Sequence, residues 1–354
     1  MLLIIVIIIT MPVTENYKGG EYMNSRYYLK KISFALVTIA VCSLLTFVLF
    51  RMMPGDVYDV KARDMAISRG ISFEQAKIMV TQMYNYDPTE PILQQMGRYY
   101  GALFQGNLGT SMTNSSITVN EIIAYYMPWT LFLVSFALTL SYILGTLLGS
   151  IMAWRRKSII SSLIAIYATI VNAIPPALVP TIVLSIFAFG FQWFPVQGAY
   201  SIEHQPGFNW LFIKDVLWHA ALPVFAYTCT QINAWVMNMK GSCIGVMAED
   251  YVTAAYARGL SSQTIRNKYV KKNALLPLYT ALALSFGAML GGATYMEGPF
   301  IYPGIGSQLG KALGNRDFTV CQGLLLVTTT ATVLASLLVD FLMPKIDPRI
   351  KVEE

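Results

Sequence analysis

WTLFLVSFALTLSYILGTLLGSIMAW, residues 129–154, contains no Asp, Glu, Lys or Arg. A helix that crosses a hydrocarbon layer of about 30 Å needs about 20 mostly apolar residues. This stretch meets that requirement with residues to spare. It therefore predicts a transmembrane helix and favours a membrane protein over a soluble one.

Five further stretches have the same uncharged, apolar character: Ile32 to Phe50, Ile159 to about Phe191, Val216 to Met239, Ala274 to Met296, and Phe318 to Val339. The chain is 55% hydrophobic and 12% charged, whereas soluble domains average about 25% charged residues. The fold expected is an all-α polytopic membrane protein with six transmembrane helices, and the alternative is the buried core of a large soluble protein. Pro175, Pro176 and Pro180 predict a kink or a break in the third stretch.

The formal net charge of +6 reflects membrane topology. Lys and Arg are concentrated in alternate connections: before the first stretch, after the second, between the fourth and fifth, and after the sixth. Cytoplasmic loops carry an excess of these residues. We therefore expect both termini to be cytoplasmic, and we expect no nucleic-acid binding.

The four cysteines and two histidines are scattered along the chain. Cys42, Cys229, Cys243, Cys321, His204 and His219 show neither paired spacing nor the spacing of a zinc site. We expect no metal site and no disulfide framework. Small apolar packing residues are the expected role of the cysteines.

Five segments are expected along the chain: residues 1–22, 23–51, 52–127, 128–344 and 345–354. The first is an extension of doubtful status, because KGGEY before Met23 resembles a translated ribosome-binding sequence; a short membrane-lying anchor is the alternative. The second holds the cytoplasmic start and the first membrane helix. The third is an extracytoplasmic insertion, with two short helices between Tyr58 and Tyr84 that are broken at Gly70. The fourth is the transmembrane core, and the last is a cytoplasmic tail.

The connection between the fourth and fifth stretches predicts a helical hairpin. EDYVTAAYA should form a helix with Val252, Ala255 and Tyr256 on one side. Gly259 supplies a break, and Ser261 is a candidate N-cap for a second, basic helix that runs to Lys272. A solvated basic loop that only sets topology is the alternative.

Short strings along residues 23–351 resemble, in order, the permease subunits of binding-protein-dependent ABC importers for dipeptides and oligopeptides. They are NSRYYLKKI, RMMPGD, GNLGTS, MPWTLFL, FPVQG, WHAALP, EDYVTAAYARGL, NALLP, MEGPFIYPGIG, RDFTVCQG and DPRIK. The order and spacing of these strings carry the resemblance, which is to the first of the two homologous permeases of such a transporter. It implies a location in the bacterial cell membrane and the type I ABC importer permease fold, with a helical insertion between helices 1 and 2 and with residues 128–344 as the permease core.

The resemblance implies that residues 248–277 hold the family's EAA loop, whose helix lies in a groove of the ATPase subunit. The coupling residues expected on this basis are Glu249, Asp250, Thr253, Ala254, Ala255, Arg258, Gly259, Leu260 and Pro277, with Leu276 beside the last. Thr253 stands where the motif usually has glutamate. The small residues suit a helix that approaches a partner closely, and glycine adopts backbone conformations that other residues resist.

The resemblance also implies the partners: a second homologous permease, two ATPase subunits and an extracytoplasmic solute-binding protein. No GxxxxGKS or GxxxxGKT motif is present, so we expect ATP and Mg to bind the partner ATPases, and this chain to have no cofactor and no catalytic role. The implied substrates are di- or oligopeptides. Oligosaccharides and nickel are the alternatives, because some relatives of this subfamily resemble carriers of those substrates.

Two rival functions are disfavoured by the stretches themselves. An ion-coupled carrier usually needs intramembrane acids or histidines, and only His219 and Asp340 lie near a stretch, where water is the expected environment. An intramembrane enzyme would need a catalytic arrangement that the stretches lack. Polar residues that could line a pore are Asn172, Tyr227, Gln231, Asn233 and Trp235, with Gln322 as a further candidate; hydrogen bonding between helices is their alternative role. Glycines at 145, 149, 287, 291 and 292 predict close helix packing.

Overall fold

The computed structural model describes residues 25–52, 57–84, 90–292 and 294–346, and this part of the chain is all-helical. The doubtful extension, residues 1–22, lies outside the described residues. The elements are α2 (Ser25–Met52), α3 (Val57–Arg69), α4 (Phe73–Tyr84), α5 (Ile92–Phe104), α6 (Val119–Trp154), α7 (Ile159–Ala173), α8 (Leu178–Leu184), the π-helix η1 (Ser185–Gly190), α9 (Trp210–Met247), α10 (Asp250–Ala257), α11 (Ser262–Thr264), the π-helix η2 (Ile265–Lys271), α12 (Lys272–Ala274), α13 (Leu276–Gly292), α14 (Thr294–Glu297), α15 (Ile305–Gly314) and α16 (Phe318–Ile346).

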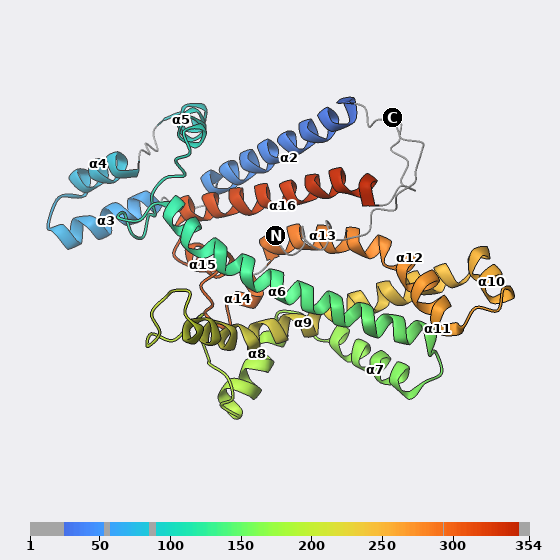
Figure 1. Cartoon of the computed structure of the whole chain (residues 1–354). Helices are drawn as coiled ribbons and strands as arrows, with labels where there is room; N and C mark the ends of the chain where they lie inside the picture. The colour runs from blue at the N-terminus through green and yellow to red at the C-terminus, as the bar shows by residue number, and fades with distance from the viewer. Residues whose placement is uncertain (1–24, 53–56, 85–89, 293, 347–354) are drawn as a thin grey trace.

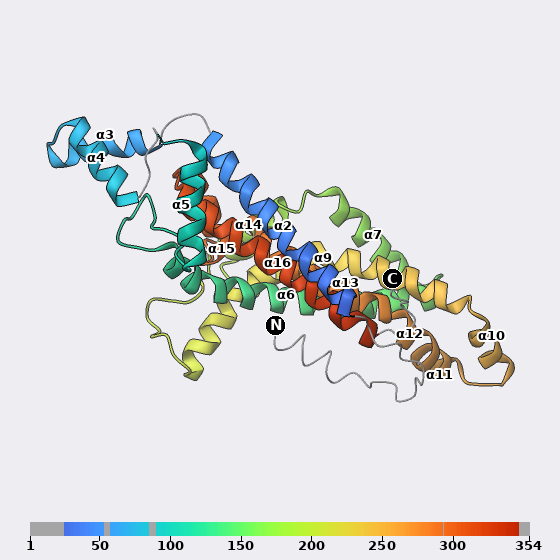
Figure 2. The ribbon, with the colours of Figure 1, turned by 90° about the horizontal axis from the view of Figure 1, so that it is seen from above.

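The long helices α2, α6, α9, α13 and α16 lie alongside one another and define an elongated bundle with two distinct ends (Figure 1, Figure 2). Helices α3, α4 and α5 lie at one end, and α10 and α11 project from the other (Figure 1). The first turns of α2 lie against the last turns of α16, where Lys31 Nζ is 2.9 Å from Asp340 Oδ2. The start of α2 and the end of α16 are thus on the side of α10 and α11. We call this the hairpin end and the opposite one the insertion end.

Glycines allow the closest helix contacts in the bundle. A Cβ atom on Gly145 of α6 would lie 2.3 Å from the Cβ of Trp235 on α9, and one on Gly149 would lie 2.5 Å from the carbonyl oxygen of Val236. Between α13 and α16, a Cβ on Gly287 would lie 2.8 Å from that of Ala335. Close packing at positions 145, 149 and 287 is therefore confirmed, and such contacts are a usual means of helix association in membranes.

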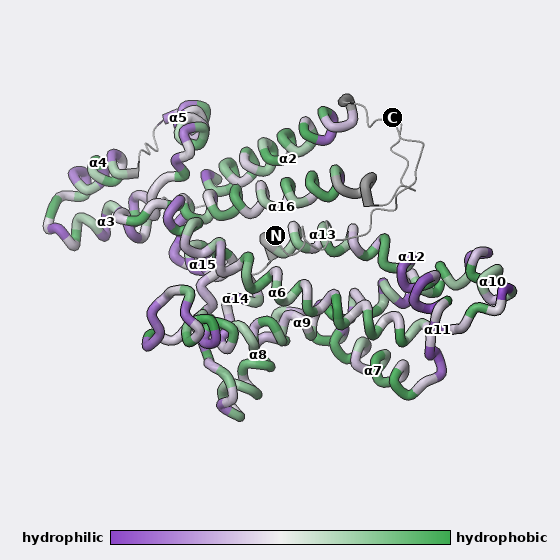
Figure 3. Tube along the Cα trace, viewed as in Figure 1, coloured by the Kyte–Doolittle hydropathy of each residue, from purple (hydrophilic) through white to green (hydrophobic). Residues whose placement is uncertain are grey.

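Three helices are by themselves long and apolar enough to cross a membrane: Tyr27–Met52, Val119–Trp154 and Phe318–Phe341. Figure 3 shows hydrophobic residues along the bundle and hydrophilic ones concentrated near its ends. Helices α7 and α8 with η1 form an apolar pair bent by 108°. The break falls at residues 174–177, so the kink expected from Pro175 and Pro176 is confirmed.

Among the described residues, each of the six apolar stretches lies mainly on helices, although the count of six membrane spans stays a prediction. Helix α9 carries the fourth stretch, and the apolar helix Leu276–Met289 carries most of the fifth. The two short helices expected in the insertion are α3 and α4, separated at Gly70 as expected. Helices α5 and α15 were not foreseen. The five segment boundaries stay predictions.

Candidate functional site

The hairpin at residues 249–274 begins with α10, a helix with one buried and one exposed face. Val252 and Ala255 are 1% and 2% exposed and pack into the bundle, whereas Thr253, Ala254 and Tyr256 are exposed. The expectation for Val252 and Ala255 is confirmed. Tyr256 instead lies half exposed on the outer face. This helix therefore offers a surface of short side chains around one aromatic ring.

Gly259 ends α10 in a Schellman motif. Its φ of +73° lies in the left-handed region, where residues with a Cβ are strained. The Leu260 amide donates to the Ala255 carbonyl at 3.3 Å, and the Gly259 amide donates to the Tyr256 carbonyl at 2.9 Å. A Cβ on Gly259 would have no neighbour within 4 Å. The glycine is thus required by backbone geometry, and the space around it is open.

Ser261 then starts the second arm of the hairpin. Its Oγ accepts a hydrogen bond from the Thr264 amide at 3.3 Å, which confirms the predicted N-cap. The arm continues through α11, η2 and α12 as far as Ala274. A π-helix of this kind is rare and often marks a functional site.

The hairpin packs into the core of the bundle. Val252 and Ala255 from its first arm, and Ile265, Val270 and Ala274 from its second, belong to one buried cluster with residues of α6, α9 and α13. Ser242 of α9 also donates to the Ala274 carbonyl at 2.8 Å. A displacement of the hairpin must therefore displace α6, α9 and α13 at the hairpin end, because packed interiors leave little free space.

The expected coupling residues divide by exposure. Those on the surface are Glu249, Asp250, Thr253, Ala254, Arg258, Gly259 and Pro277, whereas Ala255 is buried and Leu260 is partly buried. Pro277 lies apart from the α10 group, beside a hollow between α9 and α13 that is also lined by Asn238, Ser242, Leu278 and Ala281. The structure thus brings the exposed coupling residues of α10 together on one surface. Ala255 lies beneath that surface, in the buried cluster that the hairpin shares with the bundle.

The expected pore residues lie in two environments. Asn233 Nδ2 donates to Asn172 Oδ1 at 2.8 Å, so this pair links α9 to α7, as the alternative role predicts. Tyr227 and Trp235 are 3% and 4% exposed, and Gln231 is partly buried. None of these contacts tests whether the residues line a pore, and that role stays a prediction.

A buried carboxylate that the sequence reasoning missed lies at the insertion end. Glu297 is fully buried; it accepts hydrogen bonds from Thr130 Oγ1 at 2.6 Å and from the Ser307 amide at 2.9 Å. Burial raises the pKa of Glu297 despite these bonds, which act in the opposite direction. A Cβ on Gly304 would lie 2.1 Å from the carboxyl carbon, so only glycine fits there. This group ties the start of α15 to α6, and an acid within the turn-rich string MEGPFIYPGIG was the available signal.

A second acid performs a similar task at the start of α16. Asp317 is 2% exposed and accepts from Ser111 Oγ at 2.5 Å and from the Thr113 amide at 3.1 Å. It also accepts from the Val320 amide at 3.2 Å and so caps α16. The connection between α5 and α6 is thereby fixed on α16.

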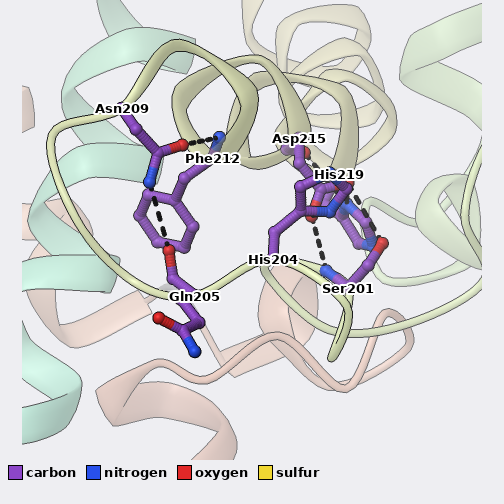
Figure 4. Close-up of polar contacts among 7 residues, drawn as sticks. All are labelled: Ser201, His204, Gln205, Asn209, Phe212, Asp215 and His219. Carbon is purple, nitrogen blue, oxygen red and sulfur yellow. Dashed lines mark hydrogen bonds and ion pairs between the residues drawn. The ribbon is translucent and has the colours of Figure 1, made fainter.

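The connection between η1 and α9 is held by a third acid, Asp215 (Figure 4). The Ser201 amide donates to its Oδ2 at 2.6 Å, His219 Nδ1 lies 3.2 Å from its Oδ1, and His204 Nδ1 lies 3.6 Å from its Oδ2. Burial opposes the charge, but the Ser201 bonds and the neighbouring histidines lower the pKa of Asp215. His219 is buried, contrary to the watery environment expected for it.

These sites tie helices together. Among the described residues no group of three or more His, Cys, Asp or Glu side chains is arranged to hold a metal ion. The geometry defines a class of protein: a helical membrane bundle, fixed by buried acids at one end, with a projecting, core-connected hairpin at the other.

Comparison with known proteins identifies the family. Residues 145–352 match the model of the binding-protein-dependent transport system inner membrane component, and this match covers more than half of the chain. The protein belongs to this family. It is therefore a membrane component of an ABC transport system, a kind of system that includes a binding protein and ATPase partners.

Curated relatives extend the match over nearly the whole chain. The di/tripeptide transport system permease protein of Pseudomonas aeruginosa is 28% identical, over 91% of this chain and 97% of the relative. The glutathione transport system permease protein of Escherichia coli is 28% identical, over 92% and 98%. The dipeptide transport system permease protein of Lactococcus lactis is 25% identical, over 92% and 99%.

Proposed function

We propose that this chain is the permease subunit of an ABC importer for di- or oligopeptides. The observation that carries the proposal is the hairpin at residues 249–274, with small exposed residues on α10 and a core continuous with α6, α9 and α13. The names of the relatives support peptides over oligosaccharides or nickel, since each of the three above is described as carrying peptides or glutathione.

We place the hairpin end in the cytoplasm and the insertion end outside. Lys30, Lys31, Arg155, Arg156, Lys157, Lys240, Arg258, Arg266, Lys268, Lys271 and Lys272 all lie in the elements and connections of the hairpin end. The positive-inside rule assigns such an end to the cytoplasm. Both termini are then cytoplasmic, and α3–α5 form an extracytoplasmic insertion. The six spans are the apolar stretches within α2, α6, the bent pair α7–α8, α9 from Val216 onward, α13 and α16.

The assembly contains one further permease, two ATPase subunits and a solute-binding protein. ATP and Mg bind the ATPases, and this chain has no catalytic role. When the ATPases close, they move α10, and the continuous packing passes that motion to α6, α9 and α13. The bundle then changes between packed states, and peptide released by the binding protein enters the path between the permeases. The exposed face of α10 is the contact with the ATPase, and Ala255 supports it from below.

An ion-coupled carrier is a weaker explanation of the buried acids. Both oxygens of Glu297 accept bonds that fix α6 and α15, and Asp317 is similarly occupied. These contacts describe fixed ties between elements and give no sign of exchangeable ion sites.

The test is peptide uptake into proteoliposomes that hold the complete complex. Uptake should require ATP and the loaded binding protein, and persistence of uptake without ATP would contradict the proposal. Thr253→Trp, on the exposed face of α10, should abolish peptide-stimulated ATP hydrolysis while the subunit remains in the membrane. Ser68→Trp is the matched control, because Ser68 is an exposed hydroxyl residue on α3 and should tolerate the same change.

A further inference from the structure

Two hydrogen-bonding groups are buried without a partner where α6 and α9 cross. Trp235 is 4% exposed and Tyr142 is 8% exposed. Within the part of the chain that the structure describes, neither Trp235 Nε1 nor the Tyr142 hydroxyl has a hydrogen-bond partner. Their ring centroids lie 5.2 Å apart in an edge-to-face contact, and Tyr279 of α13 lies 6.2 Å from Tyr142.

A buried, unpaired donor carries a free-energy cost that a phenylalanine ring at the same place would avoid. The apolar packing between α6 and α9 at this crossing needs only the two rings and the Trp235 Cβ, which lies against Gly145. The N–H and O–H groups therefore add nothing to the packing of this conformation. They would be satisfied in a conformation that brings a hydrogen-bond acceptor to the crossing.

A hollow lies between α9 and α13, starting about one helical turn along α9 from Trp235. It has a volume of about 330 Å³ and is lined by Asn238 and Ser242 of α9 and by Pro277, Leu278 and Ala281 of α13. Asn238 follows Trp235 by about one helical turn, and Leu278 adjoins Tyr279 in sequence. Small-molecule sites commonly occupy such volumes, with a few polar groups among apolar walls.

The crossing also adjoins the hairpin. Tyr142 and Trp235 belong to the same buried cluster as Val252, Ala255 and Ile265, and Tyr279 packs against it. A movement of the hairpin that separates α6, α9 and α13 would uncover the two donors and join them to the hollow.

We propose that Tyr142 and Trp235, with Asn238 in the adjoining hollow, form a peptide-binding site that is closed in this conformation. The inference rests on the proposed transport function and names the place where the chain itself binds substrate. A peptide backbone offers carbonyl acceptors and amide donors. Trp235 Nε1 donates to a carbonyl, the Tyr142 hydroxyl donates or accepts, and the Asn238 amide does both.

The experiment removes each donor and keeps its ring, with Trp235→Phe and Tyr142→Phe in the complete complex in proteoliposomes. Each variant should lower the maximal uptake of a dipeptide about tenfold, the size of one lost hydrogen bond to a buried partner. The concentration of loaded binding protein that gives half-maximal uptake should stay unchanged, because that protein docks at the insertion end. The amount of dipeptide taken up per ATP hydrolysed should fall as well.

Trp218→Phe is the matched control, since Trp218 lies on the same helix, is 48% exposed and stacks on Phe194. It should transport like the wild type. Thermal unfolding of the detergent-solubilised Tyr142→Phe protein should be no lower than that of the wild type, because no hydrogen bond is lost in the closed form. Wild-type uptake per ATP in both variants would overturn the binding site and leave the transport function standing. Failure of wild-type uptake would overturn the transport function first.

Discussion

The hairpins at the two ends of the molecule are built alike and connected differently. In the proposed orientation, the outer hairpin joins α3 to α4 through Gly70 and Ser72, and the inner hairpin joins α10 to α11 through Gly259 and Ser261. Both glycines have a positive φ, +64° and +73°, and a Cβ on either would have no neighbour within 4 Å. Both serines cap the helix that follows.

The difference lies in what each hairpin packs against. Ala62, Met65, Ala76 and Val80 form a cluster contained within α3 and α4. The inner cluster continues from Ala255 into α6, α9 and α13. The same glycine and serine pattern therefore forms a hairpin that packs only on itself at one end, and a hairpin that packs into the helix bundle at the other. Continuity of packing, more than local conformation, distinguishes the hairpin that we propose contacts the ATPase.

A charge buried inside each hairpin should separate the roles of the two hairpins by the largest difference in activity. Ala255 is 2% exposed and Ala62 is fully buried, so Asp at either position buries an unpaired charge, which costs about 3 kcal/mol or more. Ala255→Asp should abolish peptide-stimulated ATP hydrolysis, because the shared core loses its packing. Ala62→Asp should expose only α3 and α4 to protease. Equal loss of stimulated hydrolysis in both variants would show that the outer hairpin is not self-contained.

A tryptophan in place of either glycine should give a smaller difference in stimulated ATP hydrolysis between the two hairpins. Trp at position 70 or 259 suffers the same left-handed strain, about 1–2 kcal/mol. Gly259→Trp also projects a ring beside the exposed face of α10, so stimulated hydrolysis should fall about tenfold, equivalent to about 1.4 kcal/mol of docking free energy. Gly70→Trp should remain within about twofold of the wild type. A larger loss of stimulated hydrolysis in Gly70→Trp than in Gly259→Trp would show that the α10 hairpin is not the one that couples to the ATPase.

Acid should slightly loosen the connection between η1 and α9, which Asp215 holds. The pKa of Asp215 is lowered in the folded protein, so its ties are fully present above the unfolded value of about 3.9 and are lost as pH falls through the lower folded value. A spin label at the fully exposed Ile202 should become more mobile over that interval, whereas one at Tyr256 should not. Asp215→Asn should remove the transition at Ile202. A transition that persists in this variant would place its cause elsewhere.

Much of the fold was predictable because a long apolar stretch without charged residues identifies a membrane helix, and this signal does not depend on tertiary contacts. The break at Pro175 and Pro176, the division at Gly70 and the Ser261 cap were predictable for the same reason, since each is decided locally. The hairpin's outline followed from its glycine and its helical pattern.

What sequence reasoning missed depends on contacts between distant segments. Glu297 and Thr130 are 167 residues apart in the sequence, and nothing in the residues around either one indicates that they form a hydrogen bond. The burial of His219 depends on the path of the chain from Ser201 to Asp215. Likewise, the resemblance included Ala255 among the expected coupling residues, and only the packing of α10 shows that it lies beneath the exposed face of that helix.

Site-specific cross-linking can show whether the hairpin at residues 249–274 contacts the ATPase, on which the proposed coupling depends. A photoreactive group at the exposed Ala254 should form a cross-link with an ATPase subunit in the assembled complex, with a yield that changes on ATP binding. The same group at Ile67, which is 82% exposed on α3, should form none. A cross-link from Ile67 to the ATPase, or labelling of Ala254→Cys by a membrane-impermeant reagent outside intact cells, would contradict the account.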